Sequence, residues 1–252
     1  MLKTYVFALY GFLYLPLSVM VAFSFNDARR NVVWRGFTLD WYRSLFHNAP
    51  LMASLWTTLE LAVTASAIAT TLGLLASYAL ARHPAFRGKG GYHGLLTVPL
   101  MMPEIVMGVG LLSFFARARL PLSFWTLAGA HALIALPYTV GSIRARLASL
   151  KESRLEEAAM DLGATEWQAF LKITLPLARP ALVSGALLAF TVSFEDFITS
   201  FFIKPIGLET MPIRIYSMMK FGVTPEINAM ATCLLLLTVA LLGLSRLLTK
   251  RA

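Results

Sequence analysis

Charged residues are scarce in this sequence of 252 residues. They make up 14% of the chain and hydrophobic residues 58%, whereas soluble globular domains average about 25% charged residues. The mean hydropathy of +0.68 agrees with this bias. The composition excludes an ordinary soluble domain and predicts an all-α integral membrane protein.

Groups that bind metals or perform catalysis are also scarce. Cys233 is the single cysteine, which excludes an intrachain disulfide, and the four histidines show no metal-ligand spacing. We find no nucleophile–base set. The glycine-rich stretch 87–91 lacks the glycine spacing and the Ser or Thr after lysine that a phosphate-binding loop needs. We therefore expect no enzyme activity, no ATP hydrolysis, and no metal or cofactor in this chain.

The net charge of +9 does not indicate nucleic-acid binding. The basic residues are scattered at the ends of apolar runs, as in membrane proteins that contact anionic lipid. With the N-terminus inside, the cytoplasmic segments hold a modest excess of Lys and Arg, which predicts that both termini are cytoplasmic. The six apolar runs long enough to span a bilayer are 4–25, 54–80, 94–116, 122–143, 180–203 and 228–248.

The longest stretch of the second half that cannot lie in a membrane is Ser153–Pro176. Ser153 with Glu156, and Thr165 with Gln168, have the spacing of two capping boxes, each of which predicts a helix start. Gly163 stands where the first helix needs a residue of positive φ. Pro176 is predicted to close the second helix. The stretch is therefore predicted to form a cytoplasmic hairpin of two short amphipathic helices.

Within this hairpin the sequence resembles the EAA loop of bacterial ABC-importer permeases. The resemblance rests on Glu157-Ala158-Ala159, Gly163 and Ile173-x-Leu175-Pro176 at their spacing. In that family the loop lies in a groove on the ATP-binding subunit and passes its closure to the membrane helices. The alternative is a surface hairpin that packs on its own protein. The resemblance implies coupling by Glu157, Ala158, Ala159, Asp161, Gly163 and Ala164.

Three of the apolar runs contain acidic residues, and Glu60, near the outer end of the run 54–80, is expected at headgroup level. Pro99 and Pro103 precede Glu104 and predict a broken helix, which is tolerated at membrane depth only in a protein interior or beside a watery cavity. The fifth run carries a polar stripe at helical spacing. The stripe consists of Thr191, Ser193, Glu195, Asp196, Thr199 and Ser200.

A charge near the bilayer centre costs about 2.5–3.5 kcal/mol on insertion scales, and no Lys or Arg lies at similar depth. We interpret His131, in the fourth run, as a satisfied core residue. A translocated cation explains the acids best, and polyamines, which stay protonated at neutral pH, suit them. Alternatively, the acids pair with a partner subunit or lie nearer the outer surface. The predicted substrate path includes Glu104, Glu195, Asp196 and Thr199.

Aromatic residues gather in the first outer segment, residues 26–50. Trp34 and Trp41 fit an interfacial aromatic belt. Alternatively, the segment contacts an external binding protein or the substrate entrance, where the two indole rings would attract a cation.

Nearly the whole chain is similar to the spermidine/putrescine permeases within that family. The similar stretches are Trp34 to Thr38 with Trp41-Tyr42, Phe86 to Lys89, Met101 to Met107, the EAA loop, and Ile215 to Met218 through Pro225-Glu226-x-Asn228-Ala229. The family often has Asp at the position of Glu104, so the resemblance does not decide which solute is carried. Permeases for iron, opines and phosphonates share much of this layout, and a stand-alone secondary transporter is the remote alternative.

The resemblance implies a type I permease fold, a single domain over 1–252 with six transmembrane helices and the hairpin between the fourth and fifth. It also implies the partners. These are an ATP-binding subunit dimer that holds ATP and Mg, a second permease, a periplasmic binding protein and the lipid of the bacterial inner membrane.

Overall fold

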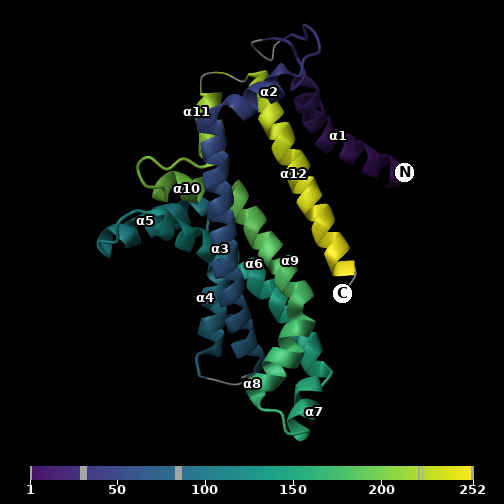
Figure 1. Cartoon of the computed structure of the whole chain (residues 1–252), viewed down its shortest axis with the longest axis vertical. Helices are drawn as coiled ribbons and strands as arrows, with labels where there is room; N and C mark the ends of the chain where they lie inside the picture. Colours follow the sequence, from purple (N-terminus) through teal and green to yellow (C-terminus); the bar gives the residue numbers. More distant parts are fainter. Residues whose placement is uncertain (1, 29–32, 83–86, 221, 223, 251–252) are drawn as a thin grey trace. The chain divides into compact units, whose positions relative to one another are not determined.

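The computed structural model describes residues 2–28, 33–82, 87–220, 222 and 224–250, and in these residues the regular structure is helical (Figure 1). The elements are α1 (Leu2–Phe23), α2 (Asp40–His47), α3 (Ala49–Arg82), α4 (Lys89–Met101), α5 (Glu104–Arg117), α6 (Phe124–Glu152), α7 (Leu155–Asp161), α8 (Glu166–Ala169), the π-helix η1 (Phe170–Thr174), α9 (Leu175–Glu195), α10 (Ile198–Ile203), α11 (Met211–Met219) and α12 (Pro225–Lys250).

Each of the six predicted apolar runs corresponds to one helix or to a broken pair. Four helical segments are long and apolar enough to span a membrane, a fifth span results if α4 and α5 are counted together, and the described part of α12 adds a shorter apolar helix. The run 94–116 is bent by 116° between Met101 and Glu104, which confirms the predicted break. The run 180–203 also breaks, at Asp196, where no break was predicted.

The described chain packs as two compact units. The terminal unit comprises Met1–Trp56 and Glu209–Ala240, and the central unit comprises Thr57–Leu208 and Leu241–Ala252. In the terminal unit, Leu45, Leu51, Met211, Ala229 and Met230 form a buried cluster that joins α2, the start of α3, α11 and the start of α12. Helix α1 is exposed from residue 4 to residue 19, as expected of a lipid-facing span.

In the central unit, α3, α6 and α9 pack side by side through small residues and hydroxyl groups (Figure 1). The Thr139 hydroxyl donates to the Ala69 carbonyl at 3.0 Å, and the Ser66 hydroxyl donates to the Ala186 carbonyl at 2.6 Å. Gly73 lies against Thr139. Lipid is as apolar as a protein core, so close packing and interhelical hydrogen bonds are what hold such helices together.

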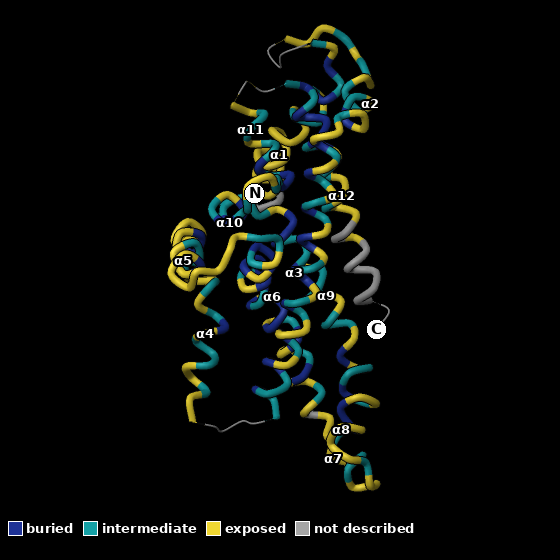
Figure 2. Tube along the Cα trace, turned by 60° about the vertical axis from the view of Figure 1, so that its left-hand side comes forward, coloured by how far each residue is buried: buried dark blue, intermediate teal, exposed yellow. Residues whose placement is uncertain are grey.

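Two short helices, α5 and α10, lie against each other beside this three-helix core (Figure 1). A Cβ atom on Gly108 of α5 would be 2.8 Å from Cδ2 of Phe202 in α10, so the two backbones approach closely. Phe115 and Ile203 are buried at the same contact. Each of these helices follows a break in an apolar run, and the remaining surface of α5 is largely exposed (Figure 2).

Candidate functional site

The predicted hairpin is present, and its turn is formed by Gly163. This residue has a φ of +90°, a conformation that costs glycine little and other residues more. Its N–H donates to the Met160 carbonyl at 2.9 Å, and the N–H of Ala164 donates to the Ala159 carbonyl at 3.0 Å. These bonds close the end of α7, as a glycine-terminated helix requires. The predicted role of Gly163 is confirmed.

One of the two predicted capping boxes is confirmed. The Gln168 N–H donates to the Thr165 hydroxyl at 3.3 Å, and the Thr165 N–H donates to the Gln168 side chain at 3.0 Å. The prediction for Ser153 is wrong, because α6 continues to Glu152 and leaves Ser153 with helical dihedral angles. The Ser153 hydroxyl donates to the Leu150 carbonyl instead. The residue before α7 is Arg154, with a φ of +53°.

The prediction that Pro176 ends the second helix of the hairpin is also wrong; we call the two helices of the hairpin its arms. The chain is helical without interruption from Glu166 to Glu195, through α8, η1 and α9. Pro176 lies in the first turn of α9. Just before it, the Leu175 N–H reaches back five residues to the Phe170 carbonyl. This wider π-turn precedes the proline, whose missing N–H and bulky ring disrupt an ordinary helical turn.

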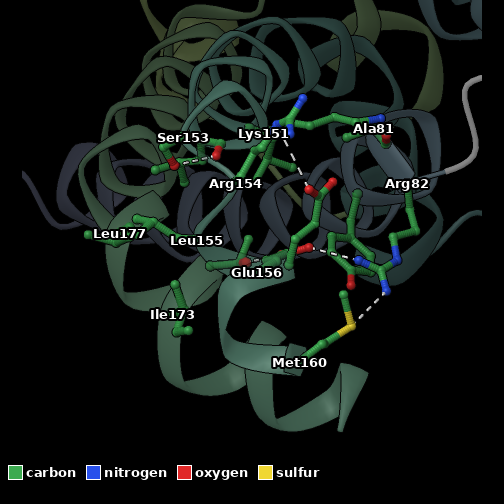
Figure 3. Close-up of a pocket in the computed structure, with 15 residues that line it drawn as sticks. Ala81, Arg82, Lys151, Ser153, Arg154, Leu155, Glu156, Met160, Ile173 and Leu177 are labelled. Carbon is green, nitrogen blue, oxygen red and sulfur yellow. Dashed lines mark hydrogen bonds and ion pairs between the residues drawn. The ribbon is translucent and has the colours of Figure 1, made fainter. Parts of the chain in front are cut away.

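Arg82, the last residue of α3, binds both helices of the hairpin, and Figure 3 shows its contact with Glu156. Its Nη1 is 2.9 Å from Oε2 of Glu156 in α7, and its Nη2 is 2.9 Å from Oε1 of Glu166 in α8. The Thr174 hydroxyl of η1 donates to the other Glu156 oxygen. We call these four residues, Arg82, Glu156, Glu166 and Thr174, the hairpin anchor. In the sequence, Arg82 is distinguished only as one of the basic residues at the ends of apolar runs.

The anchor borders a cavity of about 300 Å³ between the hairpin and the ends of α3 and α6 (Figure 3). Tyr78, Leu147 and Leu177 contribute apolar wall. The ring of Phe170 packs on that of Tyr78 with 4.6 Å between centroids. The predicted apolar face of the second arm is therefore divided, because Phe170 is buried here while Trp167 is 66% exposed.

Most of the coupling residues named from the sequence are exposed, although Glu157 also lines the cavity. Glu157, Ala158, Asp161 and Gly163 are exposed, whereas Ala159 and Ala164 are half-buried. Leu162 is 90% exposed, and Leu155, which lines the cavity, is 45% exposed. Part of the hairpin is thus fixed to the protein, and another part is exposed.

The predicted substrate-path residues of the fifth run meet at the break between α9 and α10. Asp196 accepts the backbone N–H groups of Thr199 at 3.3 Å and Ser200 at 3.0 Å, so its carboxylate caps α10. Nε2 of His131 is 3.3 Å from the same carboxylate, and Nδ1 of His131 is 2.8 Å from the Ser193 hydroxyl. His131 is a satisfied core residue, as predicted, but its pairing with Asp196 was not foreseen.

The other path residues differ in exposure. Glu195 is the last residue of α9 and Glu104 is the first residue of α5, and both are exposed. Thr199 is 1% exposed, and its hydroxyl has no hydrogen-bond partner among the described residues. Because α5 packs on α10, which follows α9 directly, the elements that carry these residues lie close to each other in the central unit.

The two tryptophans belong to the terminal unit. The indole N–H of Trp41 donates to the Asn26 carbonyl at 2.8 Å, and Trp41 packs against the buried cluster of that unit. Trp34 is 48% exposed and lies edge-on to Phe23, with 6.2 Å between ring centroids. Trp34 therefore offers more free aromatic surface than Trp41.

Comparison with known proteins places this geometry in a family. The model of the family described as "binding-protein-dependent transport system inner membrane component" matches residues 69–252. The spermidine/putrescine transport system permease protein PotC of Haemophilus influenzae is 43% identical over 249 residues, which cover 99% of this chain and 96% of that protein. The putrescine transport system permease protein PotI of Escherichia coli K12 is 38% identical over 90% of this chain and 82% of that protein.

The fold has a counterpart among solved structures. The crystal structure of an amino acid ABC transporter with histidines superposes with a TM-score of 0.63 at 19% identity, and the match covers 86% of this chain and 100% of that one. The predicted all-helical type I permease fold and the resemblance to ABC-importer permeases are confirmed. This chain belongs to the family of inner membrane components of binding-protein-dependent transport systems.

Proposed function

We propose that this chain is the permease subunit of an ATP-driven importer that moves polyamines into the cytoplasm. The observation that carries the proposal is the 43% identity, over 99% of the chain, with a permease named for spermidine and putrescine. The acids at the start of α5 and at the break between α9 and α10 support it. A polyamine carries several ammonium groups on a flexible chain, so carboxylates spread over neighbouring helices suit it better than a single pocket would.

The proposed path divides its acids into two kinds. Glu104 and Glu195 are exposed and meet the cation directly. Asp196 keeps its helix cap and its contact with His131 while adding negative charge to the break. Thr199 supplies a hydroxyl beside it. Trp34 and Trp41 receive the cation at the outer entrance, through the attraction between an ammonium group and an aromatic face.

The proposed partners follow from the hairpin. A dimer of ATP-binding subunits, which holds the ATP and Mg, docks on the exposed side of α7 and α8, where Leu162 and Trp167 are open. Glu157, Ala158 and Ala159 belong to this contact, with Asp161, Gly163 and Ala164 at the turn. A second, related permease completes the membrane part, and a periplasmic binding protein delivers the solute. Both termini then lie in the cytoplasm.

Uptake of radiolabelled polyamine by cells that express the complete transporter tests this proposal. Hydrogen bonds to charged groups contribute about 1.5–3 kcal/mol, so we expect Glu104→Gln and Glu195→Gln each to raise the KM for spermidine by about tenfold or more. Glu60→Gln is the matched control, because Glu60 is an exposed acid of α3 outside the proposed path. Its KM should match that of the wild type.

Competition identifies the solute. Excess putrescine or spermidine should abolish labelled uptake, whereas iron and a phosphonate should not. Effective competition by iron or phosphonate alone would replace the polyamine proposal with transport of another small solute. Unchanged polyamine uptake in both Glu104→Gln and Asp196→Asn would remove these residues from the substrate path.

A further inference from the structure

The hairpin anchor links the end of α3 to the hairpin, although the two are not neighbours in the sequence. The hairpin is covalently continuous with α6 on one side and, through η1, with α9 on the other. It is not next to the end of α3 in the chain, since α3 ends more than 70 positions earlier in the sequence. Among the described residues, Arg82 bridges this gap with ion pairs to Glu156 and Glu166.

The geometry of Arg82 suits a rigid connection. A guanidinium group is a planar fork whose nitrogens bind two acceptors in fixed directions. Here the two terminal nitrogens bind carboxylates on different arms, Glu156 on α7 and Glu166 on α8. Glu156 extends this network to η1, because its second carboxylate oxygen accepts a hydrogen bond from the Thr174 hydroxyl. A single side chain of α3 is thereby linked to three segments of the hairpin region.

The two branches of the anchor differ in strength. The side chains of Arg82 and Glu156 are 23% and 26% exposed, whereas that of Glu166 is 76% exposed. Solvent screens an exposed pair far more than a partly buried one. The branch to Glu156 is therefore the stronger of the two. Tyr78 supports it one helical turn away, where its ring packs on Phe170.

A further contact ties α3 to the end of α6. The Lys151 ammonium group donates to the Ala81 carbonyl at 3.0 Å (Figure 3). Because Ala81 precedes Arg82, the last turn of α3 is held by α6 and by the hairpin together. A displacement of the hairpin that left Arg82 in place would break ion pairs on both arms, so the last turn of α3 moves with the hairpin.

We propose that Arg82 is a positioning residue that transmits displacement of the hairpin to α3, and thereby couples ATP hydrolysis to solute movement. This inference rests on the proposed function. Without Arg82 the hairpin still drives α6 and α9 through the chain, but α3 is then tied to them only by contacts such as Lys151–Ala81 and Tyr78–Phe170, and follows less closely. The ATP-binding subunits then continue to hydrolyse ATP while fewer solute molecules cross per ATP.

The test uses the complete transporter in proteoliposomes, with ATP hydrolysis and spermidine uptake measured on the same vesicles. Allosteric coupling is typically about 5–150-fold, so Arg82→Gln should lower the uptake per ATP by about tenfold while hydrolysis stays within about twofold of the wild type. Glu156→Gln should act in the same direction. Lys172→Gln is the control, because it removes an exposed positive charge from the same region and should leave the ratio unchanged.

Exchanging the charges of residues 82 and 156 distinguishes a loss of coupling from damage to the fold. The double variant Arg82→Glu with Glu156→Arg restores an ion pair and should recover most of the lost ratio. Arg82→Lys keeps the charge but loses the fork, and should give an intermediate ratio. An unchanged ratio in Arg82→Gln, or no recovery in the exchanged pair, overturns the proposal.

A second measurement does not depend on transport. Hydrogen exchange of the wild-type complex should show that ATP changes the protection of both the hairpin and the last turn of α3, residues 78–82. In Arg82→Gln the change should persist in the hairpin and become much smaller in α3. A change of wild-type size in α3 overturns the proposal. If the wild-type complex takes up no spermidine with ATP, the proposed function fails, whereas this exchange measurement still decides the role of Arg82.

Discussion

Replacing Gly73 with alanine tests the tightest contact between α3 and α6. A Cβ atom at position 73 would lie 2.4 Å from Oγ1 of Thr139 and 2.9 Å from its Cβ. Rotation of the Thr139 side chain moves Oγ1 but not Cβ, which is fixed to the backbone. The clash is therefore relieved only if the two helices separate. Separation weakens the hydrogen bond from Thr139 to the Ala69 carbonyl, which is 3.0 Å long.

Three contributions set the size of the expected change in stability. Overpacking of a tightly packed contact costs about 1–3 kcal/mol, and a lost hydrogen bond costs about 0.5–1.5 kcal/mol. The better helix propensity of alanine returns up to about 1 kcal/mol. We expect Gly73→Ala to destabilise the protein by about 2 kcal/mol, which corresponds to a Tm lower by about 4–8 °C in a chain of this size.

The assay is thermal unfolding of the purified protein in detergent, and α6 supplies the control. Gly141 is an exposed residue of α6, and a Cβ atom there would meet nothing within 4 Å. Gly141→Ala should therefore leave the Tm unchanged or raise it. Thr139→Gly removes both clashing atoms and should recover part of the loss when combined with Gly73→Ala. Equal Tm values for Gly73→Ala and the wild type would refute the close contact between α3 and α6.

Two further predictions concern the hairpin and the short helices. Thr165→Ala removes a helix cap worth about 1 kcal/mol and should speed hydrogen exchange of the Gln168 amide, while Ser153→Ala, at the position where the predicted cap is absent, should leave the exchange of α7 unchanged; equal effects would contradict this assignment. Gly108→Ala places a Cβ atom 2.8 Å from Cδ2 of Phe202, a ring that can move, so we expect a loss of about 1 kcal/mol, recovered by Phe202→Ala and measured by the same thermal unfolding.

Local signals in the sequence predicted local structure well. Gly163 and the Thr165 capping box involve residues within five positions of each other, so their spacing contains the information that sets their geometry. The bend at Pro103 is also local, because proline lacks the N–H that an ongoing helix needs. For these features, the pattern and the structure agree.

The errors arose where a distant partner or a neighbouring helix changed the outcome. Ser153 has a good capping sequence, but α6 continues up to it and fixes its backbone in a helical conformation. Glu156, its expected partner, binds Arg82, which is 74 positions away. Neither fact is visible in a window of a few residues.

The candidate path shows the same limit. The polar stripe of the fifth run correctly indicated that Asp196 and Thr199 lie together. It gave no sign that Asp196 caps a new helix or that His131, 65 positions earlier, contacts it. Pairing across helices depends on how the helices pack, which no periodicity within one of them reveals.

The π-turn of η1 fixes the direction in which the hairpin faces. A π-turn contains one residue more than an α-helical turn, and each residue of an α-helix advances the rotation by about 100°. A shortening of η1 by one residue would therefore turn α7 and α8 about the axis of α9 by roughly a quarter of a revolution. Arg82 would then no longer face both carboxylates, and the apolar side of the hairpin would point elsewhere. The one additional residue of the π-turn therefore sets the orientation of the hairpin relative to α9.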